Sequence, residues 1–340
     1  MLTLVFLFAV PVLLMTVLFH VMPALTRPGL FFAVTVQPEF RRTPEGRRIV
    51  RRFHIFLWSC ALIAVVLELT TGLALAAMLI QMAGCLGSFI SAHAQARAYA
   101  VAPDAVVEVD LAAPPERLPG GPVAAFLPFA FIAAVGAWAA LHWDSLPPRF
   151  PVHWGFRGAD RWVATTPSTV FGFLAVQASL CLMLLGIAWG VLNWSRRIST
   201  AGPSATSERL FRHRILLWLI AAEYLLAAPA CFAVFEPASK FLDIWLAAIA
   251  IGVMAILVTL LRAGQGGSRT STATEGAPIG DRTPDACWKW GLIYVNPADP
   301  SLLVEKRFGV GYTVNLGNRR ALLLLALLLI PATIALIFLR

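Results

Sequence analysis

Long apolar blocks, separated by polar segments, run through this chain from one end to the other. A sliding window of about 19 residues finds them at positions 2–22, 53–71, 73–93, 123–142, 170–192, 215–235, 241–261 and 321–339. Each block can cross about 30 Å of hydrocarbon as a helix, in which every backbone polar group finds a partner within the segment. The pattern predicts an all-α polytopic membrane protein with about eight transmembrane helices.

The composition agrees with this fold class. Hydrophobic residues make up 59% of the 340 positions and charged residues 13%, which excludes a soluble globular chain. The net charge of +9 comes mainly from arginines between the apolar blocks. Anionic headgroups account for such a charge, so we expect the lipid bilayer, and no nucleic acid, as the partner of these arginines.

The arginines concentrate in three of the polar segments. The segment after the first block contains Arg27, Arg41, Arg42, Arg47, Arg48, Arg51 and Arg52. The segments after the fifth block and before the last block are also rich in basic residues. Because positively charged loops stay on the cytoplasmic side, these segments are expected inside, which places both termini outside.

The polar segments divide the chain into a three-helix unit with an arginine-rich cytoplasmic loop, a helix pair around an outer loop, a second helix pair, a flexible linker, a small cytoplasmic β-element and a last helix. These parts are expected at 1–122, 123–192, 193–262, 263–286, 287–320 and 321–340. Small polar residues predict the linker. Strand-like runs, separated by turn chemistry at Asn296-Pro297, predict the β-element.

The outer loop between the fourth and fifth blocks carries the most specific chemistry. Its prolines keep residues 149–153 extended, and its glycines permit a reversal that brings Asp160 back toward His153. The candidate ligand-binding side chains of this loop are His153, Trp154, Asp160, Arg161 and Trp162.

A divalent metal is an alternative ligand of the same loop. The candidate metal ligands are His142, His153 and Asp160, because histidine and carboxylate side chains bind such ions. In the other interpretation, His153 and Asp160 hydrogen-bond each other to hold the loop, while its tryptophans lie at headgroup level. Since the spacing of these residues is not diagnostic, we expect no cofactor and keep the metal as the alternative.

Polar side chains inside the apolar blocks are a second candidate site. Glu223, Gln81 and Glu68 lie within the sixth, third and second blocks, where polar groups are costly and often functional. If they converge, they line a polar cavity that a transporter requires. In the alternative interpretation they serve helix packing, with Glu223 protonated or bonded to a neighbouring helix.

Motifs of common enzymes are missing from the sequence. It contains no C-x-x-C, H-E-x-x-H, G-x-S-x-G or P-loop pattern. The cysteines lie mostly within apolar blocks, where they act as small apolar side chains. No catalytic residue is therefore assigned, and an enzyme is not the first choice.

Two patterns resemble known families. The outer loop contains Pro148, Pro151, His153, Trp154, Gly158, Asp160, Arg161 and Trp162, and this pattern resembles the domain of unknown function that begins the SdpI-type bacteriocin-immunity membrane proteins. The run from Trp288-Lys289-Trp290-Gly291 through Asn296-Pro297 to Asn315 resembles a second domain without an assigned role that often accompanies the first. The resemblance implies a multi-pass protein of the bacterial cytoplasmic membrane, with immunity or envelope-stress signalling as its nearest described role.

These observations favour an envelope sensor or an immunity or stress-response protein. It would bind a peptide or an envelope component through the outer loop and hold a cytoplasmic regulator on the β-element. A secondary transporter that uses Glu223, Gln81 and Glu68 is the alternative. A metal-dependent enzyme at the outer face is the third hypothesis.

Overall fold

The computed structural model describes residues 2–103, 116–155, 158–195, 203–233, 239–269 and 280–338 of the chain. Eight long helices dominate this part. They are α1 (Leu2–Leu25), α2 (Pro44–Thr71), α3 (Ala74–Ala96), α4 (Gly121–Leu141), α5 (Pro167–Asn193), α6 (Pro203–Ala227), α7 (Ser239–Ala263) and α8 (Ala321–Phe338). Seven of them, α2 to α8, are long and apolar enough to cross a membrane, and α1 contributes a shorter apolar stretch at Pro11–Leu25. The prediction of an all-α polytopic membrane protein is confirmed.

Helix α2 shows how the sequence sets the ends of these elements. Thr43 caps the helix by accepting a hydrogen bond from the backbone N–H of Gly46 at 3.1 Å, and Pro44 supplies the fixed φ of the first turn. The helix ends at Gly72, whose φ of 70° is a left-handed conformation that glycine adopts without strain. Since α3 begins at Ala74, the two helices form a tight antiparallel pair.

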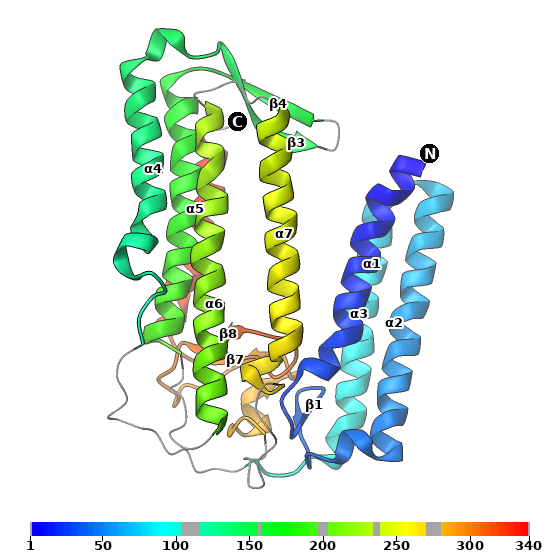
Figure 1. Cartoon of the computed structure of the whole chain (residues 1–340). Coiled ribbons are helices and arrows are strands. Elements are labelled where there is room, and N and C mark those ends of the chain that lie inside the picture. The colour runs from blue at the N-terminus through cyan, green and yellow to red at the C-terminus, as the bar shows by residue number, and fades with distance from the viewer. Residues whose placement is uncertain are drawn as a thin grey trace.

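The helices form two groups, as Figure 1 shows. Helices α1, α2 and α3 contact one another, and α4 to α8 form a second group in which α5 packs on α4, α6 and α8. Small residues let α5 and α8 approach closely, because a Cβ atom at Gly186 would lie 2.4 Å from the Leu327 side chain of α8.

In the described part of the chain, four two-stranded antiparallel hairpins lie at the two ends of the helices. One end carries β3 (Arg149–Gly155) and β4 (Gly158–Ala164), and we call it the hairpin end. The opposite end carries the other six strands, and we call it the basic end. These strands are β1 (Leu30–Phe31), β2 (Val34–Thr35), β5 (Trp288–Lys289), β6 (Ile293–Tyr294), β7 (Leu303–Glu305) and β8 (Tyr312–Val314). The small β-element expected before the last helix is therefore present, and both chain termini lie toward the hairpin end (Figure 1).

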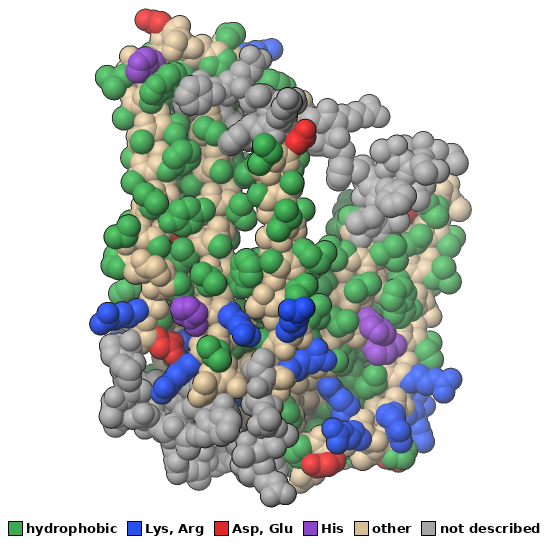
Figure 2. All heavy atoms as spheres, viewed as in Figure 1, with side chains coloured by type: hydrophobic (Ala, Val, Ile, Leu, Met, Phe, Trp, Pro, Cys, Tyr) green, Lys and Arg blue, Asp and Glu red, His purple; other side chains and the backbone are tan. Residues whose placement is uncertain are grey.

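Side-chain types follow the same division. Figure 2 shows hydrophobic side chains over the middle of both helix groups, with Lys and Arg gathered toward the basic end. Large apolar side chains such as Leu62 and Ile251 are more than half exposed on the helix surfaces. An apolar band with a basic rim is typical of a protein that spans a bilayer, and the fold is that of a multi-pass membrane protein.

Candidate functional site

The loop between α4 and α5, which the sequence predicts to lie outside, is a β-hairpin. Strands β3 and β4 pair so that His153 lies opposite Arg161 and Pro151 lies opposite Trp162. The predicted reversal is present, and in its register the residue opposite His153 is Arg161, one position after the expected Asp160. The backbones of Trp154 and Asp160 belong to the two strands, but both side chains lie outside the described part of the chain.

One side of the hairpin is anchored and the other is open. Phe150 is buried, and its ring lies 5.6 Å from that of Phe173 in α5, between ring centroids. His153 and Arg161 are exposed, and Trp162 is 44% exposed. The hairpin therefore exposes basic side chains at His153 and Arg161 and an aromatic side chain at Trp162.

The third metal candidate, His142, lies at the C-terminal end of α4, in the connection that leads to the hairpin. Its ring stacks on Trp138 with centroids 4.6 Å apart, and its Nδ1 lies 3.1 Å from the backbone oxygen of Trp138. Among the described side chains, no group of three or more His, Cys, Asp or Glu residues could hold a metal ion. The Asp160 side chain lies outside the described part of the chain, so the metal site with His153 stays a prediction.

The intramembrane candidates lie in different helix groups. Gln81 of α3 is buried and donates a hydrogen bond to Thr16 Oγ1 of α1 at 2.8 Å, and Glu68 lies near the end of α2. Glu223 lies in α6 of the second group, where it is fully buried and neither carboxylate oxygen has a hydrogen-bond partner among the described residues. Gln81 therefore joins helices within the first group.

At the basic end, residues 280–320 form a compact unit that we call the platform. Its centre is Arg307, which is buried and donates to both oxygens of Asp281, from Nε at 3.0 Å and from Nη2 at 2.7 Å. Arg307 also pairs with Asp285, which accepts a hydrogen bond from Thr35 Oγ1 of β2 at 2.7 Å. This ion cluster links the platform to the first helix group.

A second set of ion pairs joins the two helix groups directly. Arg27, just after α1, pairs with Glu208 of α6 at 3.1 Å and with Glu305 of β7. Burial opposes the charge of Arg27, but Glu305 and Glu208 raise the pKa of its guanidinium. The basic end is thus held together by buried and half-buried ion pairs, whereas the sequence indicated only a set of inner-face arginines.

The turns of the platform depend on one buried asparagine. Asn315 Nδ2 donates to the backbone oxygens of Asn296, Asp299 and Ser301, at 2.9, 3.1 and 3.1 Å. Its Oδ1 accepts from the backbone N–H groups of Asn296 and Gly317, both at 3.0 Å. The asparagine-rich pattern of this segment therefore has a structural role.

Helix α5 connects the hairpin to the platform. At its start, Thr169 Oγ1 donates to the backbone oxygen of Ala164, the last residue of β4, at 2.6 Å. At its other end, the backbone oxygen of Trp194 accepts from the N–H groups of Leu302 and Leu303, at 2.8 and 3.1 Å. One helix thus touches both specialised ends of the second group.

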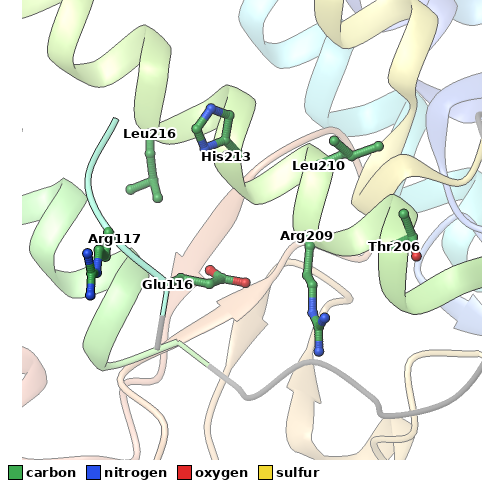
Figure 3. A pocket seen from close by; sticks show the side chains of 7 residues that line it. All are labelled: Glu116, Arg117, Thr206, Arg209, Leu210, His213 and Leu216. Atoms are coloured by element: carbon green, nitrogen blue, oxygen red, sulfur yellow. The ribbon is translucent and has the colours of Figure 1, made fainter. Parts of the chain in front are cut away.

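A pocket of about 370 Å³ lies beside the platform, between the segment before α4 and α6. Figure 3 shows Glu116 and Arg117 on one side, with Arg209 and His213 of α6 on the other. Glu116 pairs with Arg212 at 3.5 Å. Sequence analysis missed this pocket, because nothing in the sequence indicates that residue 116 meets α6.

The Arg307 cluster predicts an acid-sensitive platform. Burial alone would raise the pKa of Asp281, but Arg307 and Thr283 lower it below its ordinary value of 3.8. A carboxyl group whose pKa is lowered on folding stabilises the fold above its unfolded pKa, and this stabilisation is lost as the pH falls through the folded pKa. We expect the thermal midpoint to fall below about pH 4 and to fall less steeply in Asp281→Asn. Equal acid dependence in both proteins would contradict this assignment.

Comparison with known families finds two matches, one at each end of α5. Residues 129–178, which include the hairpin, match a domain of unknown function (DUF1648). Residues 297–322, which include Asn315 and Arg307, match a family of unknown function (DUF5808). No curated protein and no solved structure gives a significant match. The chain is an integral membrane protein with two segments similar to domains of unknown function.

Proposed function

We propose that this protein is a membrane sensor of the envelope, which binds a ligand at the hairpin and transmits binding to the platform through α5. The contact of α5 with β4 at one end and with β7 at the other carries this proposal. A helix of 27 residues extends about 40 Å at 1.5 Å per residue. It is long enough to connect events on the two sides of a bilayer.

The exposed side of the hairpin suggests the ligand. His153 lies opposite Arg161, and the half-exposed Trp162 is the next residue of β4, so the hairpin offers both basic and aromatic groups. Such groups bind acidic or amphipathic peptides and anionic envelope components. The resemblance of the loop to the SdpI-type immunity proteins also supports a peptide ligand, and the platform is then the surface for a cytoplasmic regulator.

The coupling between hairpin and platform can be tested without knowing the ligand. We expect Phe150→Ala to loosen the anchored side of the hairpin, because it removes the ring that packs on Phe173. Backbone amides of β7, at the far end of α5, should then exchange hydrogen at least about 5-fold faster. This factor is the lower limit of the effects that coupling between two sites of a protein usually has. Hydrogen exchange of the protein in lipid nanodiscs measures this.

The matched control is Phe126→Ala, which removes an exposed ring from α4. Amides of α2 and α3 serve as an internal reference, because a general loss of stability would raise their exchange as well. The coupling proposal fails if β7 exchanges at the wild-type rate in Phe150→Ala, or if Phe126→Ala has the same effect.

Transport is the second hypothesis, and the burial of Glu223 without a described hydrogen-bond partner favours it. Gln81 and Glu68 lie in the other helix group, so a transport path through all three residues would have to cross between the groups. The sensor proposal is supported by contacts at both ends of one helix, and we therefore prefer it. An outer-face enzyme would need His142 to turn from Trp138 toward the hairpin.

A further inference from the structure

A cavity of about 420 Å³ opens between the end of α1 and the start of α2, away from the hairpin and the platform pocket. Its polar lining consists of Arg41, Arg47, Arg51, His20 and His54. The remaining lining is apolar and includes Val50 and Ile55. The cavity therefore combines a basic and an apolar lining.

The basic side presents uncompensated positive charge. Arg47 and Arg51 are four residues apart in α2 and share one face of the helix. Both side chains are exposed, and no carboxylate among the described residues forms an ion pair with either of them. An anion that enters the cavity can thus bind two arginines without displacing an existing partner.

Arg41 fixes one wall of the cavity. Its Nη2 donates to the backbone oxygen of Pro23 and to Thr26 Oγ1, the latter at 2.9 Å, so its guanidinium is held in place. Burial and then the nearby Arg269 lower the pKa of Arg41, as expected for a buried cation next to a second positive charge. A bound anion would relieve this repulsion.

The apolar side leads toward the middle of the membrane. Ile55, Trp58 and Leu62 follow one another along α2 at helical spacing, and their side chains are 55%, 41% and 66% exposed. The indole Nε1 of Trp58 donates to His20 Nδ1 at 3.3 Å, which places the ring at the rim. Helix α2 runs from the basic end toward the hairpin end. This apolar stripe therefore begins about one helical turn beyond Arg51, on the side of the arginines that faces the hairpin end.

We propose that the cavity binds one anionic phospholipid. Its phosphate would lie between Arg47 and Arg51, and an acyl chain would lie along Ile55, Trp58 and Leu62. Basic pockets between transmembrane helices at the cytoplasmic face suit such headgroups. A free phosphate ion satisfies the arginines but leaves the apolar stripe unused, and we therefore assign the site to lipid.

The experiment is native mass spectrometry of the delipidated full-length protein, titrated with phosphatidylglycerol or with phosphatidylcholine of the same acyl chains. We expect one phosphatidylglycerol to bind more tightly than phosphatidylcholine. Arg47→Gln/Arg51→Gln should weaken phosphatidylglycerol binding about 10- to 30-fold, since each arginine contributes about a factor of five. The matched control is Arg48→Gln/Arg52→Gln, which removes the same charge from residues outside the cavity lining and should change binding less than about 3-fold.

Two further measurements distinguish a lipid phosphate from a free phosphate ion. Ile55→Gln should weaken phosphatidylglycerol binding, and inorganic phosphate at the lipid concentration should leave the bound lipid in place. Circular dichroism checks that each variant is folded. If either double variant unfolds, the single variants Arg51→Gln and Arg52→Gln are compared instead. The proposal is overturned if both lipids bind equally, if both arginine pairs have the same effect, or if inorganic phosphate displaces the lipid.

Discussion

Replacement of Arg307 by Ala is expected to lower the free energy of unfolding by about 3–5 kcal/mol, as the loss of one member of a buried ion pair does. The guanidinium is buried and binds Asp281 through two nitrogens. Without it, the largely buried carboxylate of Asp281 keeps its charge but loses its main partner. Thermal unfolding in detergent, followed by circular dichroism, measures the effect.

The loss should extend beyond the platform. Arg307 Nη1 donates to the backbone oxygen of Ala33 at 3.2 Å, and Asp285 binds both Arg307 and Thr35. Phe308, the next residue, packs in the cluster that contains Phe32 and Phe89 of the first helix group. We expect hydrogen exchange of β1 and β2 to rise together with that of the platform, because the two share these contacts.

Three variants test the cause. Arg320→Ala removes an exposed arginine and should change stability by less than about 0.5 kcal/mol. Arg307→Lys keeps the charge but not the two-nitrogen contact, so its effect should be intermediate. Arg307→Met combined with Asp281→Asn and Asp285→Asn should recover much of the loss, since no charge is then left without a partner. A loss below about 1 kcal/mol in Arg307→Ala would contradict the role of the cluster.

The helices and the hairpin between α4 and α5 could be predicted because their signals are local. An apolar block long enough to cross a bilayer forms a helix whatever its neighbours are. Between Pro147 and Gly158, the prolines restrict the backbone to extended conformations and the glycines permit a tight turn. The chain reversal in this segment therefore follows from its own residues. The turn residues around Asn296-Pro297 indicated the β-element for the same reason.

The arrangement of the helices and the charge pairs could not be predicted in this way. Nothing in an apolar helix specifies which neighbour it will contact, so the placement of Gln81 and Glu223 in separate groups required the structure. Asp281 belonged to a segment interpreted as a linker, and its pairing with Arg307 depends on the folded platform. Asp285 meets Thr35 across 250 positions of sequence. Contacts between residues so far apart in the sequence produce no periodic pattern of residue types along the chain.

Replacement of Asn315 by Ala is expected to destabilise the platform by about 3 kcal/mol, because it leaves several buried backbone groups without a partner. The side chain is fully buried and satisfies three backbone oxygens and two N–H groups. Asn315→Asp keeps the shape but cannot donate to the oxygens, so it should be nearly as harmful. Asn193→Ala, at an exposed site in α5, is the control and should be close to neutral.

The same variant tests the sensor proposal from the opposite end. Coupling between two sites is reciprocal, so a platform loosened by Asn315→Ala should raise hydrogen exchange in β3 and β4 through α5. When the two variants lose the same local stability at the mutated site, the fold-increase in hydrogen exchange of β3 and β4 in Asn315→Ala should equal that of β7 in Phe150→Ala. An increase confined to residues 280–320 would show that α5 carries no signal, and the hairpin and the platform would then be independent parts of the protein.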